Sequence, residues 1–141
     1  MVDPTRLRAL LDRIDTEVAE LQSLGAKGKD SLLLDATALA AAKYRLVVSI
    51  EAAIDSGQHI IASEGLEPPA NYAEIFEILG RHKYLPSDQV PALMKMAGFR
   101  NLLVHGYADI DDAVVAEVVV GRLDDLVSYR RSIAKSTLDA S

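Results

Sequence analysis

The sequence predicts an all-α fold, an up-and-down bundle of about five helices that forms a single domain over residues 1–141. Apolar residues recur at helical spacing along most of the chain, and no segment alternates apolar and polar residues as a half-buried strand does. Half of the residues (50%) are hydrophobic, and 141 residues suffice to bury one core without a disulfide or a metal.

Two helices are expected in the N-terminal half. Asp3 and Pro4 form a favourable N-cap and first-turn pair, and apolar residues keep helical spacing from there until Gly25. After a loop rich in Gly and Lys, a long helix with many Ala and Leu residues is expected from Ser31 to about Ser63. A glycine and a pair of prolines follow this helix and end it. With these bounds it is the longest helix that the sequence predicts.

Three further helices are expected in the C-terminal half. Asn71, with Glu74 three residues later, has the form of a capping box that opens a helix over residues 71–80. Proline and serine then introduce a helix over residues 88–105, and an aspartate caps a last helix over residues 111–135. The residues of this last helix that we expect to face the core are Val114, Val118, Leu123, Leu126 and Ile133.

The amino-acid composition excludes several classes of protein. Cysteine is absent, which excludes disulfide scaffolds and thiolate metal sites and fits a reducing compartment. The N-terminus has no apolar stretch after a basic start, so we expect no secretory signal. No charge-free apolar run reaches the length of about 20 residues that spans a bilayer. The expectation is a soluble, cytoplasmic protein without a membrane partner.

Net charge argues against a nucleic-acid partner, and the charge distribution softens that argument. The chain carries −6 with a sequence pI near 5.0, so the whole molecule would repel RNA at long range. Residues 81–107 are locally positive, because a single acid, Asp88, stands there against Arg81, Lys83, Lys95 and Arg100.

The most informative segment is FRNLLVHGY at residues 99–107. A helical step of about 100° per residue places Arg100, Asn101, Val104 and His105 on one arc of roughly 140°, opposite Met96, Phe99, Leu102 and Leu103. A guanidinium can grip a phosphate with two hydrogen bonds, and an imidazole exchanges a proton near neutral pH. This face suits phosphodiester binding or cleavage, but spacing alone favours a surface or C-capping role.

The same segment resembles the Arg-x4-His-x-Tyr signature of the HepT-like toxins of the HEPN superfamily. Arg100, His105 and Tyr107 reproduce that signature in full, within Gly-Phe-Arg-Asn-x-x-x-His-x-Tyr. The likeness extends in order and spacing over roughly residues 40–135 and also includes Tyr44–Arg45, Ile50–Glu51–Ala52, His59–Ile60–Ile61, Asn71–Tyr72, Phe76, Leu79 and residues 122–126.

The resemblance implies a HEPN-like helical dimer that acts as a toxin, a metal-independent ribonuclease silenced by a minimal nucleotidyltransferase partner. RNA carries its own nucleophile, the 2′-hydroxyl, so cleavage needs a base, an acid and a cation for the phosphorane charge. His105 would transfer a proton, Arg100 would stabilise the phosphate, and Asn101 would hold His105 or a phosphate oxygen. No metal or cofactor is expected. Since one chain supplies one motif histidine, a homodimer that faces two motif helices across a cleft is expected.

Tyr107 is expected just past the helix end, beyond Gly106, which can adopt the left-handed conformation that ends a helix. In the resembling toxins this tyrosine accepts adenylyl groups from the nucleotidyltransferase. An AMP on its hydroxyl would add negative charge and a purine beside Arg100 and His105 and so repel RNA. The other tyrosines are expected to be half-buried packing residues with hydrated hydroxyls, namely Tyr44, Tyr72, Tyr84 and Tyr129.

Other polar groups carry weaker signals. Glu51, Asp55 and His59 are spaced four residues apart along the long helix and could in principle hold a metal. We favour a solvent-exposed or subunit-facing stripe, because no second cluster of carboxylates and histidines completes a site. Glu51 has a second possible role, orienting Arg100 from a position opposite the motif helix. His82 lies in a charged loop and is assigned no chemistry.

Two other functions remain open on sequence alone. In the first, the protein is a non-catalytic nucleotide-binding or interaction module, in which Arg100 and His105 only bind a phosphate and Tyr107 is the partner's substrate. The acidic composition and the single base per chain favour it, whereas the intact motif favours the nuclease. In the second, the protein is a purely structural helical dimer.

Overall fold

The computed structural model describes residues 1–106 and 109–139. Within these ranges the chain forms α-helices, one short 3₁₀ helix and no strand, which confirms the all-α prediction. None of these helices combines the length and apolar character that crossing a bilayer requires. The elements are α1 (Pro4–Leu24), α2 (Lys29–Leu33), α3 (Ala36–Ser63), α4 (Tyr72–Arg81), η1 (Ser87–Gln89), α5 (Val90–His105), α6 (Asp112–Gly121) and α7 (Leu123–Thr137).

Two of the five expected helices are each broken in two, so the described residues contain seven. The long helix is interrupted before Asp35, whose side chain accepts a hydrogen bond from the Ala38 amide at 3.0 Å and caps α3. Aspartate competes in this way with the helical backbone, which separates α2 from α3. The last helix breaks at Gly121 and Arg122, where Arg122 has φ −123° and ψ 3°.

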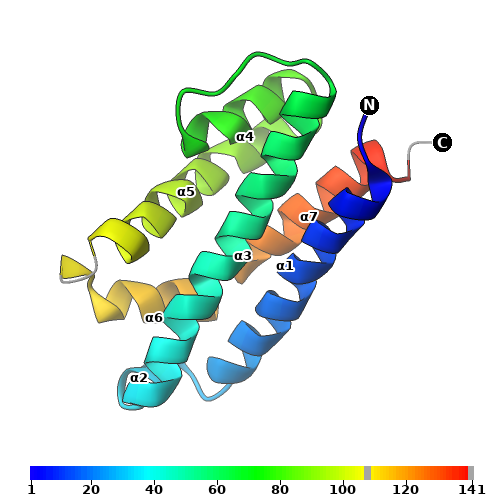
Figure 1. The fold of residues 1–141 in the computed structure, drawn as a ribbon. Coiled ribbons are helices and arrows are strands. Elements are labelled where there is room, and N and C mark those ends of the chain that lie inside the picture. The colour runs from blue at the N-terminus through cyan, green and yellow to red at the C-terminus, as the bar shows by residue number, and fades with distance from the viewer. Residues whose placement is uncertain (107–108, 140–141) are drawn as a thin grey trace.

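Helix α3 runs through the middle of the molecule and contacts helices on both sides (Figure 1). Helix α1 packs along it and also contacts α7, whereas α4 and α5 pack against each other and against α3. Helix α6 closes the bundle at the end where α2 lies. The core between them is apolar and draws on every α-helix, with Leu11, Leu32, Leu46, Ile50, Ile75, Leu93, Val115 and Leu126 among its members.

Glycine permits a close approach of α3 and α4. A Cβ atom on Gly57 would lie 2.6 Å from Ile75 Cγ2 and 3.0 Å from Leu79 Cδ1. The absence of a side chain therefore lets α4 pack directly onto α3. The Asn71 side chain accepts a hydrogen bond from the Glu74 amide at 2.9 Å, so the expected cap fixes where α4 begins.

Tyr129 on α7 is fully buried, contrary to the expectation of a half-buried residue with a hydrated hydroxyl. Its hydroxyl donates to the Ala53 carbonyl at 2.9 Å and lies 2.7 Å from the Ser56 hydroxyl, and burial raises its pKa. Its ring meets Phe76 edge-on at 5.6 Å between centroids. Tyr129 thus joins α7 to α3 and α4. Tyr44, with 65% of its surface exposed, departs from the expectation in the opposite direction.

Removing the Tyr129 hydroxyl should destabilise the fold without creating a large cavity. Tyr129→Phe takes a hydrogen-bond partner from the buried Ser56 and Ala53 groups, so we expect a loss of about 1–2 kcal/mol in the free energy of unfolding. Urea denaturation followed by circular dichroism measures this loss. Tyr44→Phe is the matched control and should change stability little, because that side chain is exposed. Equal effects of the two substitutions would contradict the assignment.

Candidate active site

Arg100 occupies a core-facing position of α5. The buried residues of this helix are Leu93, Met96, Ala97 and Leu103, and Arg100 lies three residues from each of the last two. Residues three apart share a helix face, so the guanidinium points the same way as the core residues. Only 13% of the Arg100 side chain is exposed. A charged group in this position needs partners from the helices that α5 packs against.

Three side chains surround the Arg100 guanidinium. Glu51 of α3 accepts with Oε2 from Nη2 at 2.6 Å and from Nε at 3.1 Å. Asn101 Oδ1 accepts from Nη1 at 3.1 Å, and the Tyr72 ring at the start of α4 lies 5.1 Å from Cζ, a cation–π contact. Arginine has five N–H donors, so these contacts leave one N–H on each terminal nitrogen for a further acceptor.

The expected single polar face of α5 is in fact divided. Arg100 faces α3, whereas Asn101 and His105 are exposed. His105 is five positions after Arg100, which places the two side chains about 140° apart around the helix. Leu102 was expected to face inward but is 58% exposed. Arg100 and Leu103 lie on the core-facing side of α5, and Leu102 therefore lies on a side that faces outward. The bond of Asn101 is to Arg100, not to His105.

Similar shifts affect the last helix and the end of α5. Val114 was expected in the core and is 40% exposed, because the break after Gly121 resets the helical phase and buries Val115 and Val119 instead. Gly106 has φ −102°, so α5 ends without the expected left-handed residue. Tyr107 lies outside the described residues.

His105 lies in the last turn of α5, with its side chain exposed. The Gly106 amide donates to the Leu102 carbonyl at 2.9 Å and continues the helical hydrogen-bonding pattern past His105. The motif therefore presents an exposed imidazole beyond a mostly buried, fixed guanidinium.

The expected stripe of Glu51, Asp55 and His59 has separate contacts. His59 Nε2 accepts from the Asp3 amide at 3.0 Å and so fastens the start of α1. Partial burial, and then the neighbouring Glu51 charge, raises the pKa of Asp55. The part of the chain that the structure describes contains no group of three His, Asp or Glu side chains placed to hold a metal.

Sequence patterns missed one residue of the site and one ion pair. Tyr72 is 39% exposed, which agrees with the expected half-buried residue, but its contact with the Arg100 guanidinium was not expected. The capping box at Asn71 predicts where α4 starts, but no local spacing connects it to α5. His82, which was assigned no chemistry, lies 2.6 Å from a carboxylate oxygen of Glu67. A backbone hydrogen bond and then His82 lower the pKa of that carboxyl.

Comparison with known proteins identifies the family of this chain. The sequence model of the family described as "Ribonuclease HepT-like" matches residues 14–133. The chain belongs to this HepT-like family. A curated relative, the mRNA nuclease HepT of Shewanella oneidensis, is 30% identical over 79 residues, which are 56% of this chain and 59% of that protein. The alignment thus spans about three fifths of the length of that HepT protein.

Solved structures of similar chains confirm the HEPN-like fold. A tri-AMPylated Shewanella oneidensis HEPN toxin, in complex with an MNT antitoxin, has a TM-score of 0.85 and 24% identity, over 96% of this chain and 99% of that one. A toxin–antitoxin structure with AMP-PNP has a TM-score of 0.83 and 24% identity, over 94% and 99%. The Bacillus subtilis cytosolic protein YutE, of unknown function, has a TM-score of 0.84 and 20% identity, over 99% and 92%.

Proposed function

We propose that this HepT-like protein is the toxin of a toxin–antitoxin pair and cleaves RNA without a metal, at a cleft between two copies of the chain. The observation that carries the proposal is the Arg100 guanidinium, which Glu51, Asn101 and Tyr72 hold in place five residues before an exposed His105. A fixed cation near a titratable imidazole is what phosphodiester transfer to an internal hydroxyl requires.

The reaction assigns a role to each group. The imidazole of His105 in one copy takes the proton of the 2′-hydroxyl, whose oxygen attacks the adjacent phosphorus. The remaining N–H groups of Arg100 stabilise the charge on the phosphorane. The protonated His105 of the second copy then gives its proton to the departing 5′-oxygen. The products are a 2′,3′-cyclic phosphate and a 5′-hydroxyl. Glu51 and Asn101 act through Arg100 as positioning residues.

Exposed apolar side chains near the motif support the dimer. Leu102 and Val104, which precede His105, are 58% and 40% exposed. Tyr44 of α3 is 65% exposed and lines a hollow together with Leu103 of α5. Large exposed apolar groups favour association, and a two-fold axis near this end of α5 would bring two motifs together.

The named relatives support the toxin and partner assignments. One relative is called an mRNA nuclease, and structural neighbours are described as toxins in complex with an antitoxin, one of them tri-AMPylated. By this similarity we infer an RNA substrate, a nucleotidyltransferase partner and adenylylation of Tyr107. The addition of AMP would place negative charge close to the guanidinium and imidazole that bind the substrate phosphate.

One observation favours a second candidate, a non-catalytic phosphate-binding module. The Glu51 carboxylate already neutralises Arg100, and the chain carries −6 overall, both of which weaken attraction for an RNA phosphate. In that case RNA or a nucleotide would bind at the motif and remain uncut. Cleavage and binding assays on the same variants separate the two functions.

The catalytic roles predict loss of function in two variants. His105→Ala and Arg100→Ala should each reduce RNA cleavage by at least about 100-fold and relieve growth inhibition, with helicity unchanged by circular dichroism. Cleavage should survive EDTA and leave a 2′,3′-cyclic or 3′-phosphate end. His82→Ala is the control and should stay active, since its partner is the surface residue Glu67. An active His105→Ala protein, or metal-dependent products with 3′-hydroxyl ends, would contradict the mechanism.

The proposed dimer predicts that a charge introduced near the motif shifts the protein toward the monomer. The wild-type protein should have the mass of two chains in multi-angle light scattering at micromolar concentration. Leu102→Glu should shift it toward the monomer and reduce cleavage, because it places a desolvated charge in the interface. Leu34→Glu, at a leucine that is 89% exposed, is the control and should remain dimeric. A monomeric wild-type protein would remove the shared cleft from the proposal.

The proposed regulation by a nucleotidyltransferase predicts that Tyr107 is adenylylated. Incubation with the cognate nucleotidyltransferase, ATP and magnesium should add one or more AMP units to Tyr107 and silence the protein. Tyr107→Phe should block the mass increase seen by intact-mass and peptide mass spectrometry. The assignment fails if the modification occurs on another residue only, or if the modified protein remains fully toxic.

A further inference from the structure

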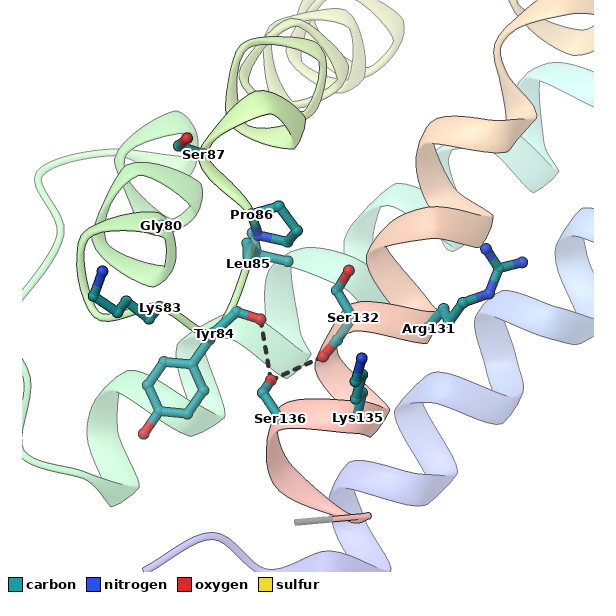
Figure 2. A pocket seen from close by; sticks show the side chains of 10 residues that line it. All are labelled: Gly80, Lys83, Tyr84, Leu85, Pro86, Ser87, Arg131, Ser132, Lys135 and Ser136. Carbon is teal, nitrogen blue, oxygen red and sulfur yellow. Dashed lines mark hydrogen bonds between the residues drawn. The ribbon is translucent and has the colours of Figure 1, made fainter.

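A cavity of about 680 Å³ lies between the turn that follows α4 and the last turns of α7. It is far from His105, because it adjoins the opposite end of α5, a helix of 16 residues and about 24 Å. Its walls contain three cations and no acid, although the chain has 21 Asp and Glu against 15 Lys and Arg. Figure 2 shows its lining: Gly80, Lys83, Tyr84, Leu85, Pro86, Ser87, Arg131, Ser132, Lys135 and Ser136.

Hydrogen bonds hold the two walls of this cavity together. The Ser136 hydroxyl on α7 donates to the Tyr84 carbonyl at 3.0 Å and lies 2.8 Å from the Ser132 carbonyl (Figure 2). The Gln89 side-chain amide donates to the Ser132 hydroxyl at 3.0 Å. The turn is thereby fixed to α7, and the cavity is part of the fold rather than a gap between independent segments.

The cations of the cavity take part in no ion pair among the residues that the structure describes. Within residues 1–106 and 109–139, ion pairs engage six Lys and Arg side chains, and these include neither Lys83 nor Arg131 nor Lys135. Lys83 has φ 65°, and no other non-glycine residue of these ranges has a positive φ. A lysine in this conformation costs about 1 kcal/mol that a glycine would not.

The cations lie on both walls. Figure 2 shows Lys83 on the side of α4, and Arg131 and Lys135 on α7, with the Lys83 and Arg131 head groups extending to opposite sides of the view. All three residues are exposed, so their long side chains can change rotamer without disturbing the core. An anion in the cavity would draw the Lys83 and Arg131 head groups inward.

The positive surface ends at the cavity. On the α4 side Glu67 pairs with Arg81 and His82, and on the α7 side Asp12 and Asp15 pair with Arg130. An extended nucleic-acid strand needs a continuous basic track, which these pairs interrupt. The geometry therefore fits a bounded ligand with its charge concentrated in one place.

We propose that this cavity binds a small ligand with two or more linked phosphate groups, such as inorganic pyrophosphate or the phosphate chain of a nucleotide. Arg131 can hold one phosphate with two hydrogen bonds, Lys83 and Lys135 act as point charges from either side, and Ser87 offers a hydroxyl at the rim. The site is separate from Arg100 and His105 and does not depend on the proposed ribonuclease activity.

Isothermal titration calorimetry of the full-length protein with sodium pyrophosphate and with ATP tests the proposal. We expect one ligand per chain and an affinity that falls as NaCl is added. The triple variant Lys83→Gln, Arg131→Gln, Lys135→Gln should weaken binding at least about 30-fold, because three charge-assisted contacts are lost. A matched triple variant, Arg8→Gln, Lys27→Gln, Lys29→Gln, removes the same charge at exposed positions outside the cavity and should bind like the wild type.

Two further variants separate binding from folding and locate the site. Lys83→Gly should raise the midpoint of urea unfolding, since it relieves the positive φ, while it weakens pyrophosphate binding. Arg100→Ala should keep the pyrophosphate binding that depends on Lys83, Arg131 and Lys135, whatever its effect on RNA cleavage.

Three results would overturn the proposal. The first is no binding of pyrophosphate or ATP to the wild type. The second is wild-type binding by the Lys83, Arg131, Lys135 triple variant, or loss of binding in Arg100→Ala. The third is single-stranded RNA that binds through these three cations while pyrophosphate and ATP do not, which would make the cavity part of a nucleic-acid track.

Discussion

A charged guanidinium at a core-facing position of α5 is the constraint around which the site is organised. Arg100 shares its helix face with Ala97 and Leu103, so the charge must be compensated from within the protein. Glu51 supplies an opposite charge from α3, and Tyr72 supplies an aromatic face from α4. The three helices must therefore keep their mutual positions for the cation to remain satisfied.

The scaffold behind the site maintains those positions through packing that leaves little freedom. Gly57 lets α4 sit directly on α3, and the buried Tyr129 hydroxyl joins α7 to the same part of α3. These contacts fix α3 and α4, the helices that carry Glu51 and Tyr72. His105 differs, because it lies in the last turn of α5 with its side chain exposed. The arrangement combines a rigid cation with an accessible titratable group, as acid–base chemistry on an incoming phosphodiester requires.

The net charge of the molecule is negative, but its charged side chains are unevenly distributed. Ion pairs neutralise many of the cations, as with Arg130 between Asp12 and Asp15. The cations left without an acidic partner in the described ranges include those that line the cavity at the other end of α5. Helix α5 thus connects the two sites that we propose for phosphate groups, one with an exposed imidazole and one with charge alone. The net charge of −6 therefore does not indicate the local charge at either site.

The sequence alone determined the helical class, most helix starts and the presence of an arginine and a histidine on one helix, because helix periodicity and capping depend on residues within about four positions. It indicated the family through a local motif for the same reason. Only the tertiary structure decided that Arg100 faces inward toward Glu51, which is 49 residues away, and that Tyr129 is fully buried. It also brought Lys83 and Arg131 to one cavity. Such pairings depend on which helix faces meet, and the breaks at Asp35 and Gly121 reset those faces in a way that no continuous helical pattern predicts.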